Sequence, residues 1–159
     1  MKIRIINKGS RNQLVCERKN DIAEVADLGP ALPFHDIAHF VVESQLGLRN
    51  GFYGNIYDGY TVRQLSDKEF IKTLPLQAIV AEVVTRTLQS LANGACIKSE
   101  CMSIVTAEFS IHKIDYPLTL DETVIEQMLS RYEELLTQWK NVKEGEALEM
   151  VIVFPISPD

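Results

Sequence analysis

Residues 34–46 form the segment that most restricts how this chain can fold. If the segment is helical, it has no broad polar face, because its apolar residues point in almost every direction around the axis: Phe34, Ile37, Ala38, Phe40, Val41, Val42 and Leu46. A helix that is apolar on every side has to be buried. Pro33 suits the first turn of such a helix, and Gly47 suits its C-terminal end. We therefore expect the rest of the chain to fold around this helix.

The same segment carries two of the three histidines of the chain. His35, His39 and Glu43 follow one another at intervals of four residues, so in a helix each lies only about 40° around the axis from the one before. Two imidazoles and a carboxylate in one line are ligand types that zinc and other divalent transition metals prefer. We predict that His35, His39 and Glu43 bind a metal, and that Asp36 orients the His39 ring through a hydrogen bond.

An alternative interpretation keeps these residues but removes the metal. The polar side chains would then form a buried hydrogen-bond network that docks the helix, in a non-enzymatic interaction or scaffold module. A complete metal site needs a fourth ligand, either a water or a side chain such as His112. A catalytic metal would activate a water for hydrolysis of an unidentified small molecule, but the sequence does not decide whether the protein is an enzyme.

Composition excludes several classes of function. The chain has 159 residues, of which 46% are hydrophobic and 24% charged, as expected for a single globular domain spanning residues 1–159. Its net charge of -6 and scattered basic residues argue against nucleic acid and anionic lipid as partners. No apolar run is long enough to cross a membrane, and the N-terminal residues lack a signal-peptide core. We expect a cytoplasmic protein with three free thiols, Cys16, Cys96 and Cys101.

Both ends of the chain show the alternation of apolar and polar residues that is typical of strands. Short runs at residues 2–5, 13–17 and 22–25 are separated by turn-forming residues at 9–12 and 19–21, and a closing strand at 148–154 ends at Pro155. The fold class predicted from this pattern is α+β: a small antiparallel sheet, made of the N-terminal strands plus the C-terminal strand, packed against three or four helices.

The middle of the chain is predicted to be mostly helical. Residues 66–69 and 119–122 have the capping-box pattern and should each begin a helix; the first is interrupted near Pro75 and resumes over 76–92. In the resumed helix we interpret Glu82 and Arg86 as an ion pair facing solvent, and Glu82 is not expected to be a ligand. Residues 96–116 remain ambiguous between a strand and a short helix.

The connection after the first helix is rich in glycine and aromatic residues, at 47–60. A connection of this length is more often a structured or functional loop than a linker. It could form a wall of a cleft beside the histidines, or an interface in a homo-oligomer. The glycines at 51 and 54 suggest a phosphate-binding loop, but the lysine and hydroxyl residue that such a loop needs do not follow.

Two motifs in the chain resemble those of a family of small bacterial proteins with no established activity. The sequence PFHDIAHFVVE at 33–43 matches a PxHDxxHxxxE core, and GLRNGFYG at 47–54 matches the GLRxGFxG segment that follows it. The basic strand at 2–5, Trp139 and the sequence GEALE at 145–149 are similar to the ends of that family. The HDxxH core is also distantly similar to the metal-binding motif of a family of ubiquinone-biosynthesis proteins. That family has its glutamate where this chain has Gly51.

Overall fold

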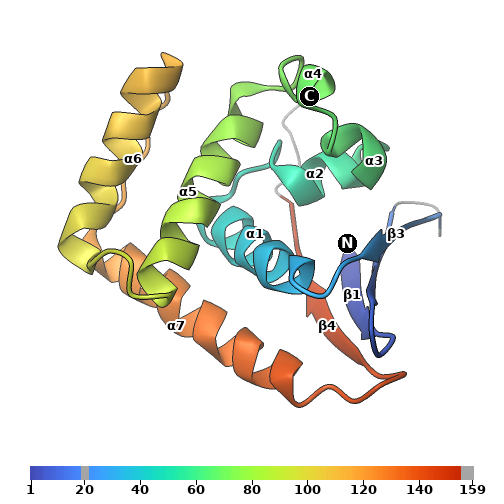
Figure 1. Ribbon diagram of the computed structural model, residues 1–159. Coiled ribbons are helices and arrows are strands. Elements are labelled where there is room, and N and C mark those ends of the chain that lie inside the picture. Colours follow the sequence, from blue (N-terminus) through green and yellow to red (C-terminus); the bar gives the residue numbers. More distant parts are fainter. Residues whose placement is uncertain (19–21, 155–159) are drawn as a thin grey trace.

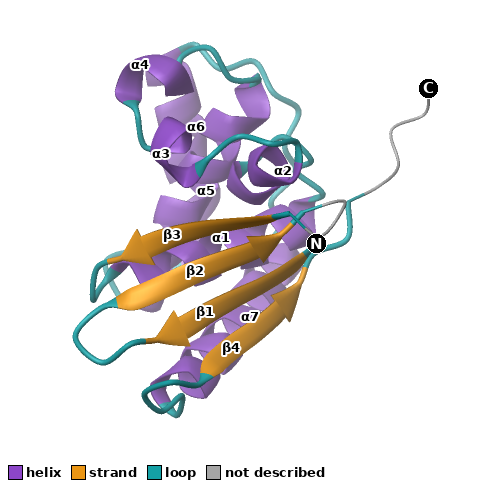
Figure 2. Ribbon diagram, turned by 90° about the vertical axis from the view of Figure 1, so that its right-hand side faces the viewer, coloured by secondary structure: helices purple, strands orange, loops and turns teal. Residues whose placement is uncertain are grey.

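The computed structural model describes residues 1–18 and 22–154 and confirms an α+β fold (Figure 1). Three strands begin the chain, seven helices follow within these residues, and a fourth strand returns to the sheet. In Figure 2 the sheet lies in front of two helices, α1 (Leu32–Leu46) and α7 (Glu122–Lys140). Three short helices lie beyond the sheet edge formed by β3 (Ala23–Leu28), namely α2 (Phe52–Tyr57), α3 (Val62–Leu65) and α4 (Lys68–Ile71). The turn predicted at 19–21 and the strand end predicted at Pro155 lie outside the described residues.

The sheet has the order β3-β2-β1-β4 and is antiparallel throughout. Its strands are β1 (Lys2–Asn7), β2 (Asn12–Glu17), β3 (Ala23–Leu28) and β4 (Ala147–Val151). Alternate residues of β1, β2 and β4 face the core, namely Ile3, Ile5, Leu14, Cys16, Leu148 and Met150. On the other face charged side chains pair across strands, such as Lys2 with Glu149 at 3.0 Å. The closing strand predicted at 148–154 is present as β4, which ends at Val151.

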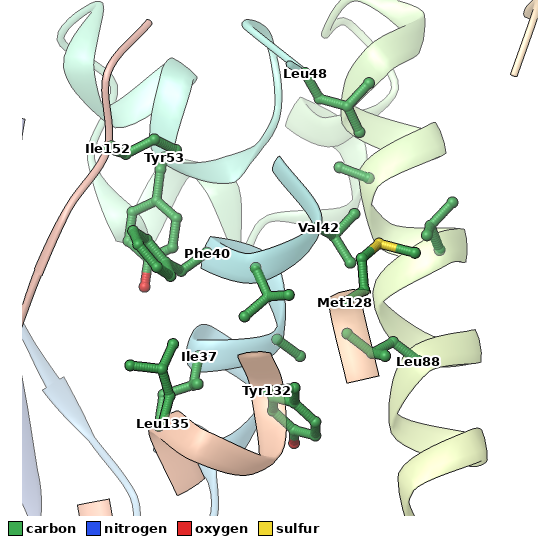
Figure 3. Close-up of a cluster of buried hydrophobic side chains, with 14 of the residues drawn as sticks. Ile37, Phe40, Val42, Leu48, Tyr53, Leu88, Met128, Tyr132, Leu135 and Ile152 are labelled. Carbon is green, nitrogen blue, oxygen red and sulfur yellow. The ribbon is translucent and has the colours of Figure 1, made fainter. Parts of the chain in front are cut away.

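Helix α1 (Leu32–Leu46) lies in the centre of the molecule, as its apolar surface predicts. It packs against α5 (Leu76–Ala92) and α7 (Glu122–Lys140). Figure 3 shows side chains from several elements around it, with Ile37 and Val42 on different sides of the helix. Gly47 ends α1 with φ of 63°, a left-handed conformation that glycine adopts without strain. The helix is fixed on most sides, so its polar residues have little freedom to move.

Four further helices complete the described fold. Three are short and lie in the part of the chain after α1: α2 (Phe52–Tyr57), α3 (Val62–Leu65) and α4 (Lys68–Ile71). The fourth, α6 (Lys98–His112), packs on α5 and α7. The glycine-rich connection thus contains a helix, α2, that contacts α1. Within the described residues, no helix is both long and apolar enough to cross a membrane.

Local details of the helices differ from the sequence-based expectations. Residues 98–112 are helical and not a strand, because Cys101, Val105 and Phe109 form a stripe with a spacing of four residues that is buried. The side chain of Asp67, not Ser66, caps the N-terminus of α4. Asp121, not Thr119, caps α7 and accepts a hydrogen bond from the Val124 N–H. Aspartate carboxylates are among the best acceptors for the free N–H groups of a first turn.

Candidate metal centre

Two histidine rings of α1 face each other at the N-terminal half of the helix. His35 and His39 are one turn apart, and their ring centroids lie 4.7 Å apart with the planes nearly perpendicular. The Nε2 atoms of the two rings are 3.2 Å apart. The spacing of four residues on a buried helix thus brings the two imidazoles together, as predicted.

The third member of the cluster is Glu82 from α5, the helix that packs beside α1 (Figure 1). Its Oε2 atom lies 3.1 Å from His39 Nε2 and 3.4 Å from His35 Nε2. Its other oxygen, Oε1, faces Arg86 Nε at 3.5 Å. The expected pair with Arg86 is present, but the interpretation of Glu82 as only a solvent-facing residue is wrong. His35, His39 and Glu82 form a cluster that could hold a metal ion.

Glu43, predicted as the third ligand, lies at the opposite edge of the His39 ring. Its Oε1 accepts a hydrogen bond from His39 Nδ1–H at 3.0 Å and from the Phe52 N–H at 2.7 Å. Its Oε2 accepts one from the Tyr53 N–H at 2.9 Å. The side chain is fully buried, so these donors compensate for the loss of water. In this position Glu43 caps the first turn of α2 and orients His39.

Gly51 makes room for this carboxylate. A Cβ atom at position 51 would lie 2.3 Å from Glu43 Cδ, far inside contact distance. The backbone N–H groups after Gly51 do bind an anion, as glycine-rich loops often do, but the anion is the protein's own Glu43. Residues 51–53 of this connection therefore hold Glu43, which in turn orients the His39 ring.

A hydrogen bond from α5 holds His35. Gln89 Oε1 lies 2.9 Å from His35 Nδ1, and an amide oxygen can only accept a hydrogen bond. His35 Nδ1 therefore carries the ring proton and donates it to Gln89. Metal-binding histidines in proteins are commonly oriented in this way.

These partners leave three acceptor atoms close to one another. When the rings are neutral, His35 and His39 each use their proton at Nδ1, so both Nε2 atoms are unprotonated. The Glu82 Oε2 atom facing them is also an acceptor. Three acceptors at 3.1–3.4 Å repel one another unless a cation lies among them.

The pKa shifts of His35, His39 and Glu82 all favour a positive charge among these three acceptors. Burial disfavours a charged His39, but hydrogen bonds with Glu43 and Glu82 outweigh it and raise its pKa to about 9. The hydrogen bond with Glu82 likewise raises the pKa of His35. Hydrogen bonds with His35 and then His39 hold the pKa of Glu82 well below its usual range. In the metal-free protein a proton on His39 therefore takes the place of the cation.

Asp36 does not orient His39, contrary to the prediction. Burial raises the pKa of this carboxyl to about 6, and its Oδ2 atom is buried without a hydrogen-bond partner. Asp36 lines a cavity of about 380 Å³, and His35, His39 and Glu82 line the same cavity. One side of the cluster thus borders a pocket large enough for a small molecule.

The other predicted ligand candidate, His112, lies outside the cluster. It is at the C-terminal end of α6, half exposed, with its Nε2 atom 3.5 Å from Glu108. Glu82 is the ligand candidate that sequence reasoning missed. Glu82 lies two residues after the buried Val80, and this position gave no sign that it faces α1. The sequence pattern of one helix does not reveal which other helix packs against it.

Comparison with protein-family models, with curated proteins and with solved structures found no match to this chain.

Proposed function

We propose that this protein binds one divalent transition metal ion, zinc in the first instance, through His35 Nε2, His39 Nε2 and Glu82 Oε2. The observation that carries the proposal is the triangle of three acceptor atoms with edges of 3.1, 3.2 and 3.4 Å. Ligand atoms bound at about 2.0–2.2 Å to a tetrahedral zinc are about 3.3–3.6 Å from one another. The triangle is therefore close to the size that zinc requires.

The proposed chemistry is hydrolysis. Two histidines, a glutamate and an open fourth position are typical of catalytic zinc sites, whereas structural zinc sites use four protein ligands. When bound, the metal would supply a water of lowered pKa as the nucleophile. The cavity beside the cluster offers space for the substrate, and Asp36 is a carboxylate at its wall.

The alternative is a non-enzymatic interaction or scaffold module in which the cluster is a buried hydrogen-bond network. It is favoured by one observation, namely that every ring nitrogen of His35 and His39 has a polar side chain within 3.4 Å. In this alternative a proton on His39 satisfies the cluster at all times. Removal of metal would then have no effect on stability.

Metal content of tag-free protein, measured by mass spectrometry after zinc reconstitution and gel filtration, tests the proposal. The wild type should hold about one equivalent, and a Glu82→Gln variant should bind zinc at least about tenfold more weakly. Glu108→Gln is the matched control, because Glu108 contacts the same Arg86 but lies outside the cluster. It should bind zinc like the wild type.

Two results would contradict the proposal. The first is wild-type protein without zinc after reconstitution, and the second is a melting temperature that a chelator leaves unchanged. Together they would favour the hydrogen-bond network. If zinc is bound, hydrolysis of 4-nitrophenyl butyrate by the wild type but not by Glu82→Gln would extend the proposal to an enzyme.

We infer that the chain is related to the small bacterial proteins whose PxHDxxHxxxE core it resembles. We also infer a cytoplasmic location, which Cys16, Cys96 and Cys101 support as free, buried thiols, since such thiols are typical of a reducing compartment.

A further inference from the structure

The cavity beside the metal cluster is mostly apolar. Five helices and one strand contribute to its wall: α1, α2, α3, α4, α5 and β3. Apart from the cluster, the wall consists largely of aliphatic side chains such as Leu28, Val62, Leu65, Ile71, Leu74 and Ile79. Its volume of about 380 Å³ lies within the range of about 300–1,000 Å³ that small-molecule pockets occupy. A ligand of this cavity would bury an apolar body.

The charges around the cavity argue against an anionic ligand. Among the described residues, no lysine or arginine lines it, whereas Asp36 and Glu82 do. Two carboxylates already balance the charge of a divalent metal, and the buried Glu43 adds a further negative charge behind His39. A phosphate or carboxylate group would thus meet a site without net positive charge.

Asp36 adds a requirement for a hydrogen-bond donor. The residue has a fractional exposure of only 5%, and it lines the cavity together with His35 and His39. Its Oδ2 atom is inaccessible and has no partner, and a buried carboxylate with unused accepting capacity is costly unless a donor reaches the carboxyl group. A ligand in the cavity would bring such a donor to the part of Asp36 that lines the wall beside the two histidines.

We propose that the cavity binds an uncharged, largely apolar small molecule whose carbonyl oxygen faces the metal and whose neighbouring N–H donates to Asp36. A primary carboxamide on an aliphatic chain has this combination of groups. The inference rests on the proposed metal site and names the class of molecule that the site would take.

Four probe molecules test separately the apolar chain, the hydrogen-bond donor and the lack of charge. Zinc-loaded protein is titrated with propanamide, hexanamide, N,N-dimethylhexanamide and hexanoate, and binding is followed by NMR of the backbone amides. Hexanamide should bind more tightly than propanamide by about fourfold for each added CH₂ group that is buried. It should also bind more tightly than N,N-dimethylhexanamide, which has no donor, and than hexanoate, which is charged.

Two variants test whether hexanamide binds in this cavity. Ala78→Phe fills part of the space from α5, and Ser66→Phe does so from the exposed rim after α3. Ser66→Phe is used if Ala78→Phe does not fold. Ala107→Phe on the exposed side of α6 is the matched control. The cavity variants should remove the advantage of hexanamide over propanamide without changing zinc content, and the control should keep both properties.

The outcomes distinguish this inference from the metal proposal. If zinc binds but hexanamide shows no advantage over propanamide or over hexanoate, the inference is overturned while the metal site stands. Equal binding of hexanamide to zinc-free and zinc-loaded protein would also overturn it, because the metal would then have no part in recognition. If zinc itself does not bind, the metal proposal fails and the inference fails with it.

Discussion

The two edges of the His39 ring face very different surroundings. At Nδ1 the fully buried Glu43 carboxylate accepts three hydrogen bonds, two of them from the backbone of α2. At Nε2 the Glu82 carboxylate is 43% exposed and borders a cavity. The inner edge is saturated with hydrogen bonds and serves to hold the ring in place. The outer edge has more acceptors than protons, and this imbalance is what makes it suited to bind a cation.

The largest expected difference between the two edges is in stability. Glu43→Gln should lower the free energy of unfolding of the metal-free protein by about 3 kcal/mol, because an amide NH₂ group cannot accept from the α2 N–H groups. Glu82→Gln should change it by less than about 1 kcal/mol, since Glu82 is partly exposed. Urea denaturation of both variants with a chelator present measures the difference. Equal losses would show that the two glutamates do not have separate roles.

The tight contact behind the ring gives the next prediction. Gly51→Ala should lower the free energy of unfolding by about 1–3 kcal/mol, because the new Cβ would overlap the Glu43 carboxyl group. Gly29→Ala is the matched control, since a Cβ there would have no atom within 4 Å. Urea denaturation curves of the two variants should differ clearly. A Gly51→Ala variant as stable as Gly29→Ala would mean that Glu43 is not held where we describe it.

The pH dependence of stability should change sign when zinc binds. In the metal-free protein the pKa of His39 is raised to about 9, above the value of about 6.5 for an unfolded chain. The stabilisation is therefore complete below about pH 6.5 and is lost as the pH rises through about 9. With zinc in excess the proton has to leave, so stability should instead increase over this range.

Urea midpoints at pH 6.5 and 9, with chelator and with zinc, measure this reversal. Asp36, whose pKa is about 6, titrates mainly below this range and contributes only at its lower end. The same slope with and without zinc would contradict competition between the metal and the proton.

The smallest effect is expected at the third histidine. His112→Ala should leave zinc content unchanged and alter the free energy of unfolding by less than about 0.5 kcal/mol, because its side chain is half exposed and pairs with the partly exposed Glu108. Mass spectrometry and urea denaturation check the two parts. Loss of zinc from this variant would place His112 in the site.

Much of the fold follows from local patterns in the sequence. The N-terminal strands, the buried helix α1 and its end at Gly47 were all predictable, because alternation and helical periodicity are properties of neighbouring residues. The helix α6 was not, since its β-branched residues at 104–106 obscured the buried stripe of Cys101, Val105 and Phe109. Tertiary packing on α5 decides between the two structures there.

The candidate site was predictable only as far as one helix extends. His35 and His39 share a face of α1, so their proximity follows from their spacing. Glu43 shares the same line, but the fold of residues 47–57 brings the N-terminus of α2 to its carboxylate and so engages both oxygens. Glu82 comes from a different helix, and no local pattern relates it to the histidines.

Anomalous diffraction at the zinc absorption edge, from crystals of the zinc-reconstituted protein at about pH 7.5, where zinc competes well with the proton, tests the central claim most directly. We predict one strong peak about 2.0–2.2 Å from His35 Nε2, His39 Nε2 and Glu82 Oε2, with Glu43 still hydrogen-bonded to His39 Nδ1. The absence of a peak at this place, or a peak bound by Glu43 instead of Glu82, would contradict the account.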